Sequence, residues 1–373
     1  MRKIIQPCGF HCIKINNLGV SFGEQTVLED VNMHIHCGSF NVIIGQNGAG
    51  KSTFLKTISG ELDPTTGSIM LAPGERLSVL SQDHFKWDAF TVMDTVMMGH
   101  TVLWDIMKQR EVLYAKEDFT DEDGLKVSEL EEKFAELDGW NAESDAAALL
   151  SGLGITEEFH YTLMKDMSGK QKVRVLLARA LFGQPDNLLL DEPTNDLDLE
   201  TVMWLENYLA NFEHTVLVVS HDRHFLNTVC THIVDIDYGK IKMYVGNYDF
   251  WYESSQLIQQ LIRNKNKRAE EKIAELQTFI ARFAANKAKS KQATSRRRLL
   301  DKMTVEEMPA SSRRYPFVGF EREREVGKDI LFVTDVSKTI DGVKLLDKVS
   351  FIVNKNDKIA FVGENELAQT TLF

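Results

Sequence analysis

The chain has 373 residues, 43% of them hydrophobic, and a net charge of −12. No uninterrupted apolar run approaches the roughly 18 residues of a membrane span, and the polar start MRKIIQPCGF is unlike a signal peptide. The sequence therefore predicts a soluble, cytoplasmic protein with room for at least two domains. Four scattered cysteines, two of them in CGFHC, lack disulfide-scaffold and zinc-site spacing and predict ordinary thiols in a reducing compartment.

The strongest local motif is NVIIGQNGAGKSTFLKTISG, in which an apolar run precedes G-x-x-x-x-G-K-S and a helical pattern follows. A strand, a glycine-rich loop and a helix are the context that a phosphate-binding loop requires. Lys51 is placed to reach the β- and γ-phosphates of a nucleotide, and the Ser52 hydroxyl to bind Mg²⁺. The predicted phosphate-binding residues are Gly45, Gln46, Asn47, Gly48, Ala49, Gly50, Lys51, Ser52 and Thr53.

Two further residues flank this motif in the sequence. Phe22, in VSFGEQTVL, either stacks on adenine or packs in the core. Gln82 follows the strand-like LSVLS and is placed to couple the metal and the attacking water to the helical region that follows. The sequence therefore predicts a cofactor contact at Phe22 and a metal and catalytic contact at Gln82.

A helical pattern begins at MSGKQKVRVLLARAL, where Ser168 and Gly169 form the expected helix start. Val173, Leu176, Leu177 and Ala180 have the spacing of a buried helical face. The start of such a helix can donate hydrogen bonds to a γ-phosphate, and Ser168 and Gly169 are the candidate contacts.

Two buried strands end in polar residues further along the chain. In NLLLDEPTNDLD the apolar run leads to Asp191, which is placed to hold the metal through water, and to Glu192, which can accept a proton from that water. In TVLVVSHDRHF a similar run leads to His221, which is placed to sense or polarise the γ-phosphate. These residues predict a site that hydrolyses a nucleoside triphosphate.

The order of GQNGAGKST, Gln82, MSGKQ, LLLDEP, TNDLD and SHD resembles the nucleotide-binding domain of the ATP-binding cassette superfamily, from about Ile13 to Tyr252. The resemblance implies an α/β P-loop NTPase fold with a helical subdomain over about residues 84–180, and ATP with Mg²⁺ as cofactors. It also implies that residues 168–171, with Ser168, Gly169 and Gln171 as the nucleotide contacts, are the signature that completes the ATP site of an opposing cassette. Residues 195–198 would link the two sites. Lys170 departs from this pattern, since it stands where the signature has its second glycine.

Residues 254–326 form the expected linker after a first cassette at 1–253. Between Arg263 and Lys302 there are thirteen Lys or Arg residues and four acidic ones, a net of +9 that leaves −21 for the rest. The segment LIQQLIRNKNKRAEEKIAELQTFIARF predicts a helix, ANKAKSKQATSRRR a polar turn, and LLDKM the start of a return. Residues 287–298 contain six basic and no acidic residues, a composition that fits either a solvated surface or contact with RNA phosphates.

The sequence from Leu331 to the C-terminus repeats the beginning of the first cassette. Adding 318 to each number aligns residues 13–55 with 331–373 without a gap, and the apolar runs ILFVTDV and KIAFVG of the second copy have a strand pattern. In the second copy Glu366, Ala368, Gln369 and Ile340 replace Gly48, Gly50, Lys51 and Phe22. A carboxylate in the cradle and a lost ammonium oppose triphosphate binding, so residues 327–373 predict the truncated start of a degenerate second cassette, the rest of which is expected beyond Phe373.

Two cassettes joined by a basic helical hairpin resemble the soluble ABC-F family, which acts on ribosomes during translation. The resemblance implies an ATPase that binds rRNA and tRNA through the tip at residues 287–298 and has no integral membrane segment. Three alternatives are the ATP-binding subunit of an ABC transporter, a DNA-maintenance ATPase, and a scaffold that binds ATP without hydrolysis.

Overall fold

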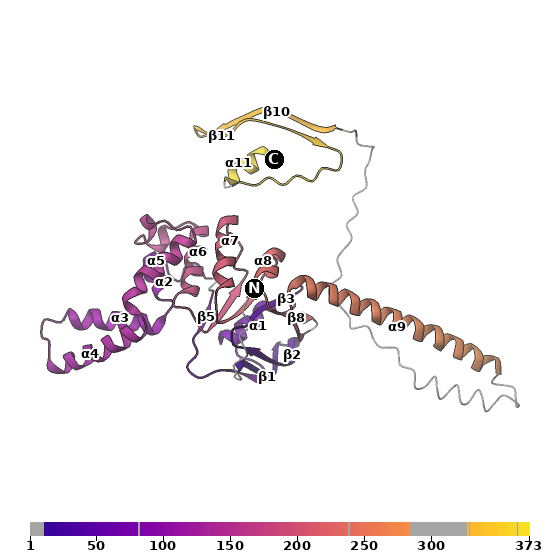
Figure 1. The fold of residues 1–373 in the computed structure, drawn as a ribbon, viewed down its shortest axis with the longest axis horizontal. Coiled ribbons are helices and arrows are strands. Elements are labelled where there is room, and N and C mark those ends of the chain that lie inside the picture. The colour runs from indigo at the N-terminus through magenta and orange to yellow at the C-terminus, as the bar shows by residue number, and fades with distance from the viewer. Residues whose placement is uncertain (1–10, 81–82, 238, 284–326, 328, 364) are drawn as a thin grey trace. The chain divides into compact units, whose positions relative to one another are not determined.

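The computed structural model describes residues 11–80, 83–237, 239–283, 327, 329–363 and 365–373. The chain divides into two compact units, Met1–Arg313 and Arg314–Phe373. Nearly all the described helices belong to the first unit (Figure 1). The domain boundary expected at 253/254 lies within one continuous helix, because Tyr248–Phe283 is helical throughout.

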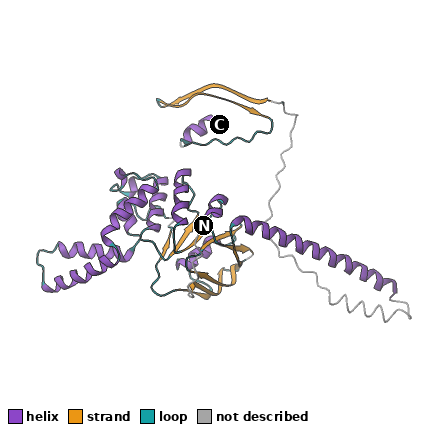
Figure 2. Cartoon of the chain, in the orientation of Figure 1, coloured by secondary structure: helices purple, strands orange, loops and turns teal. Residues whose placement is uncertain are grey.

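The first unit alternates strands and helices, as an α/β fold requires (Figure 2). Its strands are β1 His11–Phe22, β2 Gln25–His36, β3 Phe40–Gly45, β4 Thr66–Leu71, β5 Leu77–Val79, β6 Asn187–Asp191, β7 Thr215–Val219, β8 His232–Asp237 and β9 Lys240–Val245. Its α-helices are α1 Lys51–Ser59, α2 Val92–Met97, α3 Thr101–Tyr114, α4 Asp121–Glu136, α5 Ala142–Gly152, α6 Gly169–Leu181, α7 Leu199–Ala210, α8 Arg223–Val229 and α9 Tyr248–Phe283. Short 3₁₀ turns lie at Gly139–Asn141, Glu157–Phe159 and Met164–Asp166.

The central sheet has the strand order β5-β6-β7-β3-β8-β9, and all neighbours are parallel except the antiparallel edge strand β9. Strands β3, β6 and β7 are buried almost throughout, which explains their continuous apolar sequences. Because β6, β7 and β3 are adjacent and parallel, the loops that follow them emerge at the same edge of the sheet.

Alternate residues of these strands enter two different cores. On one face, Val42, Leu188 and Val218 pack with the helical region. On the other face, Ile43, Leu189 and Leu217 pack with α1 and with the antiparallel sheet β2-β1-β4. Because successive side chains of a strand point to opposite faces, each face of the sheet packs against a different layer.

Helices α3 and α4 lie side by side as a hairpin (Figure 1). Arg110 of α3 pairs with Glu131 of α4 at 2.7 Å and lies over the Phe134 ring, 3.8 Å from its centroid. A capping box between Thr120 and Asp123 begins α4. The hairpin thus has its own polar and aromatic contacts.

Helix α9 confirms the helix predicted for the first arm of the linker. It has 36 residues, which at 1.5 Å per residue give a length of about 54 Å. In the described part of the chain, no helix combines the length and the apolar composition needed to cross a membrane. The turn at 287–298 and the return arm lie outside the described residues.

The second unit repeats the first hairpin of the first unit. Its strands are β10 Asp329–Ile340 and β11 Val343–Asn354, and both have the bounds of β1 and β2 after addition of 318. The register agrees as well, since Leu18 opposite Val31 corresponds to Val336 opposite Val349. Helix α11 follows at Glu366–Leu372.

Two expectations of the sequence analysis are wrong. KIAFVG was expected to form a strand, but residues 358–363 are not in a strand. Its counterpart β3 is held between β7 and β8, whereas the strands described in the second unit, β10 and β11, pair with each other. Cys37, expected to be an ordinary thiol, is disulfide-bonded, whereas Cys230 is not part of a disulfide; sequence spacing does not show which cysteines meet in space.

Candidate functional site

The loop between β3 and α1 has the form of a phosphate-binding loop. Lys51, the first residue of α1, is buried, and its Nζ donates to the carbonyl oxygens of Gly45 at 2.9 Å and Gln46 at 3.1 Å. The ammonium is therefore held over the mouth of the loop by backbone oxygens. There it can bind phosphate oxygens.

Two glycines allow the loop to turn. Gly48 and Gly50 have φ values of 82° and 102°, a region that disfavours residues with a side chain. A Cβ at Gly50 would also lie 2.7 Å from Cγ1 of Val27. Both the backbone and the packing therefore require glycine at this position.

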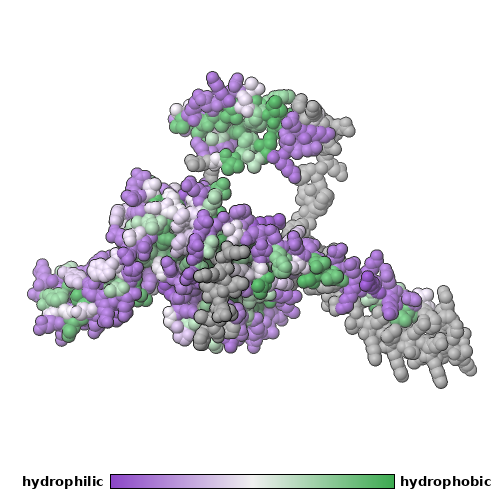
Figure 3. All heavy atoms as spheres, viewed as in Figure 1, coloured by the Kyte–Doolittle hydropathy of each residue, from purple (hydrophilic) through white to green (hydrophobic). Residues whose placement is uncertain are grey.

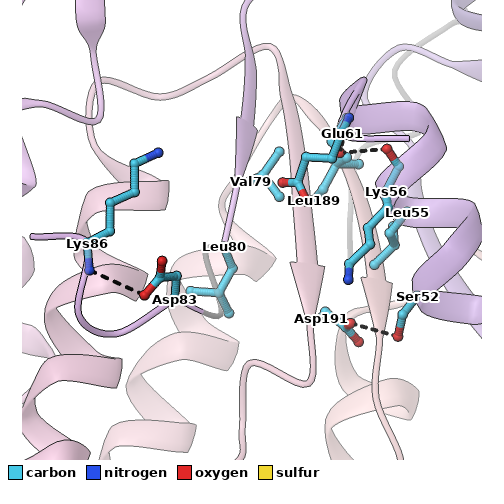
Figure 4. Close-up of a pocket in the computed structure, with 11 residues that line it drawn as sticks. Ser52, Leu55, Lys56, Glu61, Val79, Leu80, Asp83, Lys86, Leu189 and Asp191 are labelled. Carbon is cyan, nitrogen blue, oxygen red and sulfur yellow. Dashed lines mark hydrogen bonds between the residues drawn. The ribbon is translucent and has the colours of Figure 1, made fainter. Parts of the chain in front are cut away.

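Asp191 reaches the loop from the end of β6. The Ser52 Oγ donates to the Asp191 Oδ2 at 2.9 Å, although the two residues are 139 positions apart. Both residues line a cleft of about 480 Å³ between α1 and the segment that carries Asp83 and Lys86 (Figure 4). The structure thus brings together the two motifs that the sequence predicts to share a metal.

The Ser52 hydroxyl and the Asp191 carboxylate suit Mg²⁺, which prefers oxygen ligands and completes its shell with water and substrate phosphate. Among the described residues, no group of three or more His, Cys, Asp and Glu side chains could form an all-protein metal cage. The two oxygen donors, Ser52 and Asp191, suit a metal that a nucleotide shares.

Glu192 and His221 meet at the same edge of the sheet. The His221 backbone N–H donates to Glu192 Oε2 at 3.3 Å, and the His221 Nε2 lies 3.5 Å from Glu192 Oε1. Burial raises the pKa of the Glu192 carboxyl, and nearby Asp191 adds to this effect, whereas His221 opposes it. A carboxylate with a raised pKa beside the phosphate loop suits proton abstraction from water.

The predicted signature begins α6. Ser168 is the N-cap of this helix, and Gln171 Oε1 accepts hydrogen bonds from the Ser168 N–H at 3.0 Å and from its hydroxyl at 2.9 Å. Ser168 and Gly169 are exposed, and these side-chain bonds join signature residues to each other rather than to the phosphate loop. Leu176, Leu177 and Ala180 are buried as predicted, but Val173 is only half-buried, because Val175 and Lys172 take the inner positions.

The remaining candidates are spread more widely. Phe22 ends β1 with 53% of its surface exposed, so the alternative of a core position is wrong. Gln82 lies outside the described residues. The assignments of all these residues to catalysis or binding stay predictions.

Sequence reasoning missed two ion pairs that α6 makes near this site. Lys172 pairs with Asp88, and Arg174 Nη2 contacts the Asp198 carboxylate at 2.6 Å. The partners are 84 and 24 residues apart. No local pattern in the sequence shows that they meet.

Comparison with known proteins agrees with this geometry. A family model described as ABC transporter matches residues 28–195, and a second of the same description matches residues 234–319. The ATP-binding protein YkpA of Bacillus subtilis is 58% identical over 361 residues, which are 97% of this chain and 67% of YkpA. The chain belongs to the ATP-binding cassette family. The probable ATP-binding protein YbiT of Escherichia coli is 43% identical over 96% of this chain and 67% of YbiT.

The solved ATP-binding subunit of an ABC transporter has the same fold. It is 20% identical, with a TM-score of 0.50, and the match covers 66% of this chain and 94% of that subunit. The predicted cassette fold is therefore confirmed. As a cassette of this family the chain binds adenine nucleotide, and its reaction is ATP hydrolysis.

Proposed function

We propose that this cassette protein is of the ABC-F type, a cytoplasmic ATPase that binds the ribosome and uses ATP to close and open paired cassettes. The observation that carries the proposal is the second copy of the first hairpin, which follows a long charged helix in the same chain. A chain that begins two cassettes around a basic linker differs from a single transporter subunit.

In this proposal Lys51 binds the β- and γ-phosphates and Phe22 stacks on the adenine. Ser52, Asp191 and Gln82 hold Mg²⁺, which when bound neutralises charge on the phosphates. Glu192 accepts a proton from the attacking water, and His221 contacts the γ-phosphate. The 3.5 Å separation between His221 and Glu192 supports a shared role for these two residues.

The linker supports a nucleic-acid partner. Residues 287–298 contain six basic and no acidic residues in a chain whose total charge is −12. Such a segment is suited to the phosphates of rRNA and tRNA, and its binding should weaken with salt. This basic segment argues against the alternative of a membrane-transporter subunit.

The second cassette is expected to bind nucleotide weakly or not at all, because Glu366 and Gln369 replace Gly48 and Lys51.

The second unit exposes an apolar face whose counterpart is buried in the first unit. In the first unit, Ile13, Ile15 and Leu18 are fully buried, whereas their counterparts Leu331 and Val336 are 49% and 39% exposed. Figure 3 shows hydrophobic atoms on the visible surface of this unit. In the first unit, α1 and the central sheet cover the corresponding face. This supports the proposal that a further part of a cassette covers the exposed face of the second unit.

Co-sedimentation with ribosomes tests the proposal. The Glu192→Gln variant, with and without ATP, is centrifuged with ribosomes at two salt concentrations. We expect ATP-dependent binding that decreases at high salt, because the variant binds ATP without releasing it by hydrolysis. Multiple-turnover phosphate release should be about 100-fold or more slower in this variant than in the unaltered chain. That difference would exclude a scaffold that binds ATP without hydrolysing it.

A second variant supplies the control. Replacing Lys287, Lys289 and Lys291 by Gln removes charge from the tip, and ATP affinity should be unchanged while ribosome binding falls. A Glu192→Gln variant that binds ATP but stays free of ribosomes in every condition would overturn the proposal. Recovery with membrane subunits or with DNA would then favour the transporter or the DNA-maintenance alternative.

A further inference from the structure

Helix α6 pairs with two segments, one that lines the cleft of Ser52 and Asp191 and one that directly follows Asp191. One is the segment from Asp83 to Asp88, of which Asp83 and Lys86 line the cleft that Ser52 and Asp191 line from the other side (Figure 4). The other is the loop that begins at Glu192 and ends at Asp198, the N-cap of α7. A residue of α6 pairs with the end of each segment.

The first contact is made by the buried side chain of Lys172. The Lys172 Nζ pairs with Asp88 Oδ1, and the lysine side chain is only 8% exposed, against 35% for the aspartate. Asp88 is also held by its backbone, since its carbonyl accepts from the Lys165 N–H at 3.4 Å. A buried ammonium needs its counter-charge, so this pair fixes Asp88 against α6.

The second contact holds the end of the loop that carries Glu192. Asp198 accepts from Arg174 Nη2 at 2.6 Å through one oxygen and from the Thr201 N–H at 2.8 Å through the other. The start of the loop is held as well, because the Glu192 N–H donates to the Val219 carbonyl at 2.8 Å. Glu192 and Asp196 adopt positive φ values of 50° and 62°, so the loop has a conformation that needs support at both ends.

Gly154 leaves room for the guanidinium of Arg174. A Cβ at Gly154 would lie 2.8 Å from the Arg174 Nη1, and Gly154 itself has a φ of 74°. Residues two apart on a helix are rotated by about 200°. Lys172 and Arg174 therefore extend from nearly opposite sides of α6, within its first two turns.

We propose that Lys172 and Arg174 are positioning residues for ATP hydrolysis, through which α6 sets the distance between the Asp83–Asp88 wall and the loop that carries Glu192. Neither side chain is among the residues that hold the phosphates, so loss of an ion pair leaves ATP affinity unchanged. Loss of the Arg174–Asp198 pair frees the end of the Glu192 loop, and loss of the Lys172–Asp88 pair frees the opposite wall, so in both cases the spacing across the site changes and turnover falls. The proposal rests on ATP hydrolysis and is independent of a ribosomal partner.

The test uses Lys172→Met and Arg174→Met in the full chain, since methionine fills much of the same volume without charge. We expect kcat for phosphate release to fall between about tenfold and 100-fold, with the Kd for a fluorescent ATP analogue within about twofold. The control is Lys116→Met, which removes the same charge from the pair with Asp123 in the α3–α4 hairpin, and it should leave both constants unchanged.

Charge-conserving variants separate positioning from packing. Lys172→Arg and Arg174→Lys should recover most of the lost kcat. Unchanged kcat in both methionine variants would overturn the proposal. A loss of ATP affinity in parallel with kcat would overturn it as well, as would charge-conserving variants as defective as the methionine variants. If Lys172→Met does not fold, Asp88→Asn removes the same ion pair from the more exposed side, and the same split between kcat and Kd is expected.

Discussion

Glu192 combines an unusual backbone with an unusual environment. Its φ of 50° lies in the left-handed region, which costs a non-glycine residue about 1 kcal/mol or more. This conformation places the carboxylate beside His221 instead of continuing β6. The same burial that disfavours its charge makes it a stronger base.

The pH dependence of hydrolysis should show this raised pKa. A general base works when deprotonated, so kcat should fall as the pH decreases through the Glu192 pKa, with a midpoint above the ordinary value of 4.5. His221 lowers this pKa, so His221→Ala should move the acid midpoint to a still higher pH. Phosphate release measured across the pH range checks both shifts, and a midpoint at or below 4.5, or a downward shift in the variant, would contradict the assignment.

Lys51 and Gln369 show how one position keeps a contact but loses a charge. The Gln369 Nε2 donates to the Gly363 carbonyl at 2.9 Å, as the Lys51 Nζ does to Gly45 at 2.9 Å. The amide therefore closes the second loop in the same way. It brings no positive charge for a phosphate.

At the scale of elements, two glycines at α6 differ in how closely they are packed. Gly99, after α2, lies so close to α6 that a Cβ there would be 2.0 Å from the Arg179 carbonyl oxygen. Gly169, the first residue of α6, has no positive φ, and a Cβ there would have no neighbouring atom within 4 Å. Gly99 is therefore a packing requirement, whereas Gly169 is open on the surface.

These two glycines give a matched pair of stability measurements. Gly99→Ala should lower the free energy of unfolding by about 1–3 kcal/mol or more, because backbone must move to admit the methyl group. Gly169→Ala should change it by no more than about 0.5 kcal/mol. Thermal and denaturant unfolding check the difference, and equal stability of the two variants would show that α2 and α6 are not packed as described.

The second phosphate loop differs from the first in its secondary structure. Helix α11 begins at Glu366, the counterpart of Gly48, whereas α1 begins three positions later at Lys51. The positions of Gly48 and Gly50 are thus helical in the second copy, where Asn365 caps the helix by accepting from the Ala368 N–H at 3.0 Å. The turn that Gly48 and Gly50 make at positive φ in the first loop is therefore absent from the second.

At the scale of the whole molecule, this asymmetry predicts a single nucleotide site on the 373-residue chain. Equilibrium dialysis with labelled ATP and Mg²⁺ should give one nucleotide per chain, and Lys51→Ala should remove it. Adding Gln369→Lys to Lys51→Ala should not restore binding, because the glycine-dependent turn is missing as well as the ammonium. Recovery of one nucleotide per chain in the double variant would show that charge alone disables the second loop.

Local patterns in the sequence were sufficient for the fold class and for the elements that carry the candidate site. The strand, loop and helix around Lys51 lie within one short segment, and Asp191 and Glu192 directly follow a buried strand. The repeat was equally readable, because β10 and β11 pair locally and keep the register of β1 and β2. Each of these features depends on residues close in sequence.

The tertiary structure alone decided how distant segments support one another. Lys172 finds Asp88 across 84 residues, and burial of the pair depends on how α6 packs rather than on its sequence. The apolar KIAFVG is not a strand, because a parallel strand needs neighbours from elsewhere in the chain, as β3 has in β7 and β8. Sequence by itself determined the local elements and their chemistry, whereas long-range contacts decided which strands form and which charges hold the site.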